Sequence, residues 1–180
     1  MVEHRSVVNH NLSLLNTFAL TAADKLLQFS TVNFDSFIEE VFPTLFAGAT
    51  LVMIRKEHLT DVQQLTQTIV QQGVTLLKFS TAYWHSISEL NVEQLGVRMV
   101  AIGGEEADIH HYQLWRKHNP SIPLINTYGP TETTVTATLS RLEAALDKIT
   151  IGKPIANTQI HILDAQLKPV PIGFVGDMYI

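Results

Sequence analysis

The chain has 180 residues, of which 46% are hydrophobic and 16% charged, and its net charge is −5 at neutral pH. This composition is typical of a globular domain with a real apolar core, and the acidic balance leaves no basic footprint for nucleic acid. The chain has no cysteine for disulfides or thiolate chemistry, no apolar run near the roughly 20 residues of a membrane span and no signal-peptide core at its start, so we expect a cytoplasmic protein.

The first elements alternate between helix and strand. Apolar spacing predicts a helix over residues 5–18, a short strand over 24–30 and a long helix over 34–47. Pro43 predicts a kink or an early break in the long helix, and Gly48 predicts its end. Apolar residues of this helix recur at helical spacing and form one continuous face: Phe34, Phe37, Ile38, Val41, Phe42, Leu45 and Phe46.

The alternation continues to about residue 150. The patterns predict strands over residues 50–54, 74–79, 97–102, 123–126 and 135–139, and helices over 60–72 (stopped by Gly73), 82–90 and 108–118. Short alternating elements favour an α/β fold with a mostly parallel sheet flanked by helices. Farther on, residues 158–163 and 176–180 read as strands around a turn-rich segment, which predicts an antiparallel hairpin on another sheet and a β-rich C-terminal segment.

One loop carries several chemically distinct groups in a row. Residues 126–134 read Asn-Thr-Tyr-Gly-Pro-Thr-Glu-Thr-Thr between two predicted strands. Gly129-Pro130 forces a loop, from which Tyr128 could stack on a planar base and Thr131 could hydrogen-bond an anionic oxygen. Glu132 is a hard oxygen ligand suited to Mg²⁺. The residue types alone also fit an ordinary turn with a capping threonine and a solvated glutamate.

This stretch resembles the nucleotide-binding signature of the adenylate-forming superfamily, and its form is similar to amino-acid adenylation domains of nonribosomal peptide synthetases. Four further segments resemble motifs of the same family in the same order, namely residues 4–9, residues 34–42 followed by 46–52, Ala-Ile-Gly-Gly-Glu at 101–105, and residues 151–154 together with 173–180. The fold implied is part of the large N-terminal subdomain of an adenylate-forming enzyme.

The resemblance implies a nucleotide site. It places Gly103, Gly104 and Glu105 beside the adenine, although on the residues alone this is equally an ordinary strand-to-helix turn. It also implies that Asn126 reads the adenine edge and that Tyr128 stacks on the ring, with Gly129 in the same loop. Thr131 would meet phosphate and Glu132 would hold Mg²⁺, which makes these two the candidate catalytic residues and ATP and Mg²⁺ the expected cofactors.

The helix over 34–47 carries a candidate for substrate binding. By resemblance, Asp35 pairs with the α-ammonium of an amino-acid substrate, a charge-assisted pair that would select amino acids over plain fatty acids. The family pattern Phe-Asp-x-Ser is altered, because Phe37 stands at the fourth position and Ser36 at the third. The alternative is structural, since Ser36-x-x-Glu39 is a capping-box pattern.

Other pocket positions follow from the same resemblance: Ser36, Glu39, Lys78, Val100, Ile102, Thr127, Val135 and Thr136. A lysine near the end of an apolar strand should find an anion. Lys78 could pair with an acidic or amide side chain of the substrate, or Glu39 could neutralise it within the protein and leave a polar, uncharged pocket. In a third interpretation, Lys78 simply faces solvent.

The chain lacks a Ser/Thr/Gly-rich phosphate loop. We therefore expect residues 1–180 to be a partial AMP-binding domain, without the phosphate loop and C-terminal lid, and inactive by itself. The parent reaction implied is activation of an amino acid as aminoacyl-AMP and transfer to the phosphopantetheine of a peptidyl carrier protein. The alternatives are an acyl- or aryl-acid ligase and a non-catalytic remnant. Neither nucleic acid nor membrane is expected as a partner.

Overall fold

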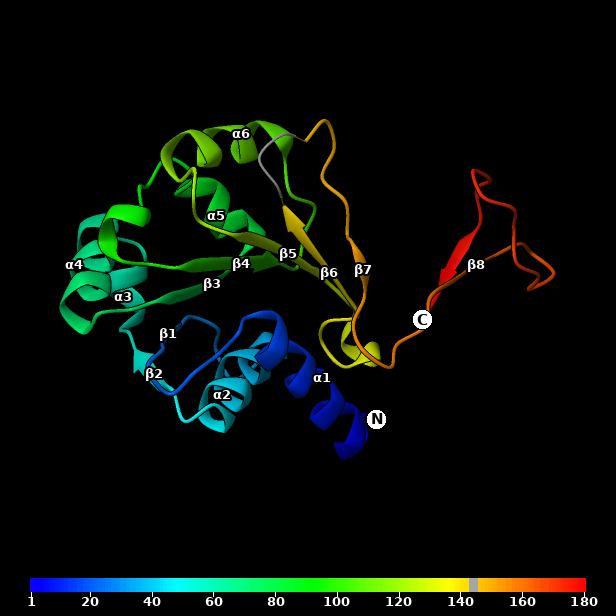
Figure 1. Cartoon of the computed structure of the whole chain (residues 1–180), viewed down its shortest axis with the longest axis horizontal. Helices are drawn as coiled ribbons and strands as arrows, with labels where there is room; N and C mark the ends of the chain where they lie inside the picture. Colours follow the sequence, from blue (N-terminus) through cyan, green and yellow to red (C-terminus); the bar gives the residue numbers. More distant parts are fainter. Residues whose placement is uncertain (143–145) are drawn as a thin grey trace.

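A computed structural model of the chain describes residues 1–142 and 146–180. In these ranges one seven-stranded sheet has the order β2-β1-β3-β4-β5-β6-β7 (Figure 1). Its strands are β1 (Lys25–Gln28), β2 (Thr50–Met53), β3 (Leu76–Ser80), β4 (Met99–Gly103), β5 (Leu124–Tyr128), β6 (Thr138–Leu142) and β7 (Lys153–Pro154). The first five strands pair in parallel and the last two antiparallel. The predicted α/β fold with a mostly parallel sheet is confirmed.

Helices cover both faces of this sheet (Figure 1). On one face lie α1 (His4–Thr17) and α2 (Ser36–Phe46). On the other face lie α3 (Lys56–Leu59), α4 (Val62–Gln72), α5 (Thr81–Ser86) and α6 (Ile109–His118). Two short 3-10 turns, η1 (Glu93–Leu95) and η2 (Thr131–Thr133), stand in the connections. The sheet therefore has a core on each side.

Alternation along the strands assigns each residue to one of these cores. In β4, Val100 and Ile102 belong to the cluster packed with Trp84 of α5 and Trp115 of α6. Ala101 and its neighbour Met99 belong to the cluster packed with α1. Because side chains alternate across a sheet, each strand presents one set of residues to each helical layer.

Most predicted elements are confirmed, with shifted ends. Gly73, in the left-handed conformation, ends α4 as predicted, and Asp108 caps α6 by accepting hydrogen bonds from two backbone N–H groups. The helix expected over 82–90 is shorter, and β6 begins at Thr138 rather than at residue 135. The later start has a local cause, since Thr134 and Val135 both have positive φ, at 69° and 67°, and cannot lie in a strand.

Helix α2 buries a different face from the one its apolar pattern predicts. Its buried residues are Glu39, Glu40, Pro43 and Thr44. Phe42, Leu45 and Phe46 are exposed, together with Phe34 just before the helix. Pro43 does not break the helix, which continues to Phe46. The two acids can be buried because each one has hydrogen-bonding partners, described below.

An ion pair ties the segment between α1 and β1 to the residue before β4. The guanidinium of Arg98 donates to both carboxylate oxygens of Asp24, at 2.7 and 2.9 Å, and to the carbonyls of Phe18 and Ala19. Burial would raise the pKa of Asp24, but Arg98 and the hydrogen bonds from Thr21 hold it well below its usual range. This bidentate geometry is the strong form of an arginine–carboxylate pair.

Beyond the main sheet, β8 (His161–Leu163) pairs antiparallel with β9 (Asp177–Tyr179) and projects from the body of the molecule (Figure 1). This confirms the predicted hairpin on a second sheet. The connection is held to α1, because Asn9 donates to the carbonyl of Ala156 and accepts from the side chain of Asn157. In the described ranges, every helix is too short or too polar to cross a bilayer.

Candidate functional site

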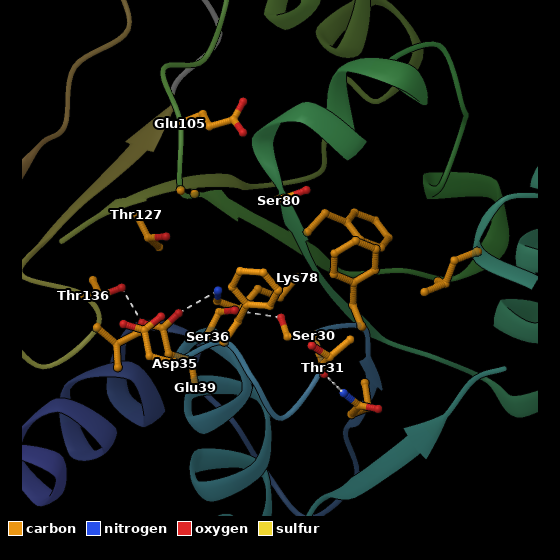
Figure 2. A pocket seen from close by; sticks show the side chains of 18 of the residues that line it. Ser30, Thr31, Asp35, Ser36, Glu39, Lys78, Ser80, Glu105, Thr127 and Thr136 are labelled. Atoms are coloured by element: carbon orange, nitrogen blue, oxygen red, sulfur yellow. Dashed lines mark hydrogen bonds and ion pairs between the residues drawn. The ribbon is translucent and has the colours of Figure 1, made fainter. Parts of the chain in front are cut away.

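A cavity of about 640 Å³ opens where β1, β3, β4 and β5 reach their carboxyl ends. Ligands of open α/β sheets characteristically bind at this edge. The cavity brings together eleven of the residues singled out from the sequence: Asp35, Ser36, Glu39, Lys78, Gly103, Gly104, Glu105, Thr127, Gly129, Val135 and Thr136. Figure 2 labels several of these side chains around the cavity: Asp35, Ser36, Glu39, Lys78, Glu105, Thr127 and Thr136.

A buried ion pair lies on the floor of the cavity. Lys78, on the α1–α2 face of β3, is 6% exposed and Glu39 of α2 is 1% exposed. The Lys78 Nζ lies 2.6 Å from Glu39 Oε2 (Figure 2). The structure therefore excludes a solvent-facing Lys78 and brings the two charges together within the protein.

Two more groups complete the surroundings of Glu39. His10 of α1 lies with Nε2 2.9 Å from Oε1 of Glu39, and the hydroxyl of Thr136 donates to the same oxygen. Both carboxylate oxygens are thus engaged. The capping-box alternative is not what the structure has. Asp35, and not Ser36, is the N-cap residue of α2, and the Asp35 side chain makes no capping hydrogen bond.

These contacts fix the ionisation of Glu39. Burial alone would raise the pKa of Glu39, but the charges and hydrogen bonds of Lys78 and His10 outweigh it and lower the pKa to about 2. A depressed carboxyl pKa contributes stability above the unfolded-state value of 4.5, and this contribution is lost as the pH falls through 2.

We expect the free energy of unfolding to fall on acidification, by on the order of 3 kcal/mol from Glu39 alone between pH 5 and pH 2. Urea titrations at several pH values would measure this, with Glu39→Gln compared with wild type because glutamine does not titrate. The wild type should show the steeper loss, and equal slopes in the two proteins would contradict the assignment.

The second buried acid of α2, Glu40, holds the wall of the cavity. Its carboxylate accepts from the backbone N–H groups of Phe29 and Ser30 at 3.0 Å and from the Ser30 hydroxyl at 2.6 Å. Burial raises the pKa of Glu40, and the bonds from Ser30, the charge of Lys78 and the bond from Phe29 only partly oppose it. Glu40 thereby fixes the segment after β1 that lines the cavity.

Asp35 lies at the start of α2, half-buried, on the cavity wall. The hydroxyl of Thr131, in the loop after β5, donates to Asp35 Oδ2 at 2.5 Å. The Ser36 hydroxyl donates to Ser30 at 2.9 Å. The contact between Asp35 and Thr131 links the predicted amino-acid half of the site to the predicted phosphate half, across 96 positions of sequence.

At the end of β4, two glycines shape the other end of the cavity. A Cβ at Gly103 would lie 2.8 Å from the carbonyl oxygen of Thr127, so the two strands can approach only with glycine there. Gly104 has a φ of +95° and open space beside it. Glu105 is exposed on the loop that follows, and its carbonyl accepts from Thr81. The backbone here is open to a flat ligand.

Six predicted residues do not line this cavity. Val100 and Ile102 are buried in the core beneath α5 and α6, because the α1–α2 face of β4 belongs to the residues that alternate with them. Asn126 is buried and donates to the carbonyl of Thr150 at 3.1 Å. Tyr128, at the end of β5, is 38% exposed. Thr131 and Glu132 lie just beyond, in η2, and Glu132 is exposed without a protein partner in the described residues.

Sequence reasoning missed several lining and supporting residues. His10, Glu40 and the segment Phe29–Thr31 were not among the candidates. The last of these had a usable signal, because it follows a predicted parallel strand and so lies at the ligand-binding edge. His10 and Glu40 had no such signal, because the role of each residue depends on a hydrogen-bonding partner from another segment of the chain.

Comparison with known proteins decides the family. The family described as AMP-binding enzyme matches residues 1–180. The chain belongs to the AMP-binding enzyme family. The resemblance seen in its motifs is therefore confirmed.

The relatives of this AMP-binding chain are large synthetases. It is 38% identical over 180 residues to a linear gramicidin synthase of Brevibacillus parabrevis, covering 100% of this chain and 2% of that protein. It is 36% identical over 181 residues to a dimodular nonribosomal peptide synthase of Bacillus subtilis, covering 100% of this chain and 8% of that one. The chain thus spans a small part of the curated relatives it matches.

Solved structures agree with the fold. A four-domain nonribosomal peptide synthetase, holo-AB3403 bound to AMP and glycine, superposes with a TM-score of 0.85 at 30% identity, over 98% of this chain and 13% of that one. The N-terminal subdomain of Klebsiella oxytoca NpsA, in complex with 3-hydroxybenzoyl-AMSN, gives a TM-score of 0.82 at 20% identity, over 97% of this chain and 44% of that one. The mixed sheet and its helices are those of the N-terminal subdomain of adenylation enzymes.

Proposed function

We propose that residues 1–180 are part of the adenylation domain of a nonribosomal peptide synthetase and carry its amino-acid pocket and part of its nucleotide site. The observation that carries the proposal is the single cavity that joins Asp35 and the Lys78–Glu39 pair to the glycine-rich end of β4. A site for joining two substrates needs both in one enclosed space, because positioning removes much of the barrier to their reaction.

In the proposed reaction, a carboxylate oxygen of the amino acid attacks the α-phosphorus of ATP. The bond to the β-phosphate breaks, and pyrophosphate leaves with the bonding electrons. Asp35 pairs with the α-ammonium of the amino acid and thereby orients its carboxylate toward the nucleotide. The thiol of a carrier-protein phosphopantetheine then takes the aminoacyl group, and AMP leaves.

The nucleotide is proposed to lie along the end of β4 and the loop after β5. Gly103, Gly104 and Glu105 flank the adenine. Thr131 donates to phosphate, for which its present hydrogen bond to Asp35 would have to exchange. The open space beside Gly104 supports the first placement. Tyr128 and Asn126 stay predictions for ring stacking and adenine recognition, and the bond of Asn126 to Thr150 would have to exchange for the latter.

Glu132 fits a magnesium ion bound jointly by protein and phosphates. Its carboxylate is exposed, has no protein partner in the described part of the chain and directly follows Thr131. Mg²⁺ is usually held through one or two carboxylates plus substrate phosphates, so one such ligand suffices. The ion would offset the negative charge of the phosphates.

We also propose that this chain is one part of a larger catalytic unit that works in the cytoplasm. It spans 44% of the NpsA subdomain and lacks a glycine-rich phosphate loop. Groups outside residues 1–180 would supply the cations that stabilise the transferring phosphoryl group.

Amino-acid-dependent exchange of radioactive pyrophosphate into ATP tests this function. The complete adenylation domain containing residues 1–180 should exchange pyrophosphate with at least one amino acid. The isolated chain should exchange it at a rate close to background. Exchange only with carboxylic acids lacking an amino group would instead identify an acyl- or aryl-acid ligase, and failure to bind ATP or any amino acid would identify a remnant.

A further inference from the structure

The ammonium of Lys78 has hydrogen-bonding capacity that the protein leaves unused. Among the described residues, its one ionic or hydrogen-bonding partner is Glu39. An ammonium carries three N–H donors and cannot accept, so two donors remain. Lys78 lines the cavity and is nearly inaccessible to bulk water, so the groups available to those donors lie in the cavity.

The positive charge of Lys78 is nevertheless balanced by its ion pair with Glu39. Glu39 neutralises Lys78, and its two oxygens are already occupied by Lys78, His10 and Thr136. A ligand therefore meets the donors of Lys78 without meeting an uncompensated positive charge from this pair.

Two hydroxyl groups that line the same cavity can accept hydrogen bonds from a ligand, whereas Lys78 can only donate them. Thr127 donates its hydroxyl proton to the carbonyl of Ile102 at 2.9 Å, and Thr136 donates its own to Glu39. Both protons are used inside the protein, so each oxygen keeps lone pairs for a donor from a ligand. Thr127 and Thr136 both line the cavity.

From this arrangement we infer that the substrate amino acid carries a neutral polar side chain, a hydroxyl or a carboxamide, that accepts a hydrogen bond from Lys78. The inference rests on the proposed function and specifies the substrate class of that site. A carboxamide matches both characters, since its oxygen accepts from Lys78 while its NH₂ group donates to a threonine oxygen.

Apolar, acidic and cationic substrate side chains fit the Lys78–Glu39 pair less well. An apolar side chain would cover the Lys78 donors without providing an acceptor, and a buried donor without a partner is costly. An acidic side chain would add a second negative charge to a pair that is already neutral. A cationic side chain would face Lys78 itself.

The ranking of substrates by the complete adenylation domain containing residues 1–180 tests the inference. Pyrophosphate exchange would be measured as kcat/KM with Asn, Gln, Ser and Thr, with Asp and Glu, with Leu and Val, and with Lys and Arg. We expect the best substrate to be in the first group, about 10- to 100-fold above its isosteric acid or apolar counterpart, the range of one hydrogen bond to a charged donor.

A best substrate that is acidic, apolar or cationic would overturn the inference while leaving the proposed function intact. Exchange with no amino acid in the panel would overturn both. The two failures are therefore distinguishable from one set of measurements.

A charge-changing variant provides a second test. Glu39→Gln keeps the shape and an acceptor oxygen but leaves Lys78 uncompensated, so the ratio of Asp to Asn activation, or of Glu to Gln, should rise by about 10-fold or more. Glu89→Gln, at an exposed position outside the cavity, removes the same charge and should leave the ratio unchanged. An unchanged ratio in a folded Glu39→Gln variant would contradict the role of the pair, and the wild-type ranking decides the inference if that variant does not fold.

Discussion

Replacing Asp35 by asparagine should lower kcat/KM for the amino acid in pyrophosphate exchange by about 100-fold. The substitution keeps the size of the side chain and an oxygen able to accept from Thr131, so the contact of 2.5 Å between α2 and the loop after β5 can persist. It removes the negative charge proposed to hold the α-ammonium. The loss should appear for every amino acid, because the α-ammonium is common to all of them.

Two comparisons make the Asp35 result specific. Asp147→Asn removes the same charge at an exposed position outside the cavity and should leave exchange unchanged. Binding of ATP by Asp35→Asn should stay close to wild type, which calorimetry can measure. Wild-type exchange by the Asp35→Asn domain would remove Asp35 from the proposed site and would favour the acyl- or aryl-acid ligase alternative.

Removing Lys78 should destabilise the fold by about 3 kcal/mol or more. In Lys78→Met, the carboxylate of Glu39 stays buried at 1% exposure but loses the ammonium 2.6 Å away. A buried charge that has lost its partner carries most of its desolvation penalty uncompensated. Denaturant unfolding at neutral pH would measure the change as a lower midpoint with little change in slope.

The double variant Lys78→Met, Glu39→Gln separates charge from packing. Glutamine can still accept from Thr136, and with both charges absent the loss of stability should shrink to about 1 kcal/mol. Lys25→Met is the matched control. Among the described residues the ammonium of Lys25 makes one exposed hydrogen bond, to the carbonyl of Gln72, and its loss should cost less than about 1 kcal/mol. A double variant as unstable as Lys78→Met alone would show that the lysine acts through packing rather than charge.

Local signals predicted much of the fold. The end of α4 at Gly73 was predicted from this residue type alone, and the structure has it there. Short alternating elements were enough to predict the mostly parallel sheet. The strand after the Tyr-Gly-Pro loop was predicted to begin at residue 135 and begins at Thr138. Thr134 and Val135 have positive φ although neither is a glycine, so their residue types do not indicate this conformation.

Helix α2 shows where pattern reasoning fails. Its apolar spacing predicts one face, yet the sheet side of the helix is the one that carries Glu39 and Glu40. Acidic residues are buried there because partners from α1, β3 and the segment after β1 reach them. Those partners lie 10 to 39 positions away in sequence, so no local window contains the information.

Val100 and Ile102 illustrate the same limit within the site. Both belong to the right strand, but they face the core beneath α5 and α6. The residues of β4 alternate between its two faces, and the sequence of the strand does not say which face borders the cavity. That depends on which helices cover each face, and therefore on the positions of α1 and α2.

The separation of the two faces of β3 and β4 has a consequence for how this scaffold can diversify. Lys78 and Gly103 line the cavity, while Leu77, Val100 and Ile102 pack against the opposite layer of helices. A gene that accumulates substitutions on the cavity face can change the pocket while the opposite layer of helices stays as it is, provided that Lys78 and Glu39 change together and Gly103 is kept. Exchanging such residues between synthetases would therefore be a smaller intervention than exchanging whole strands, whose second face carries contacts fitted to its own helices.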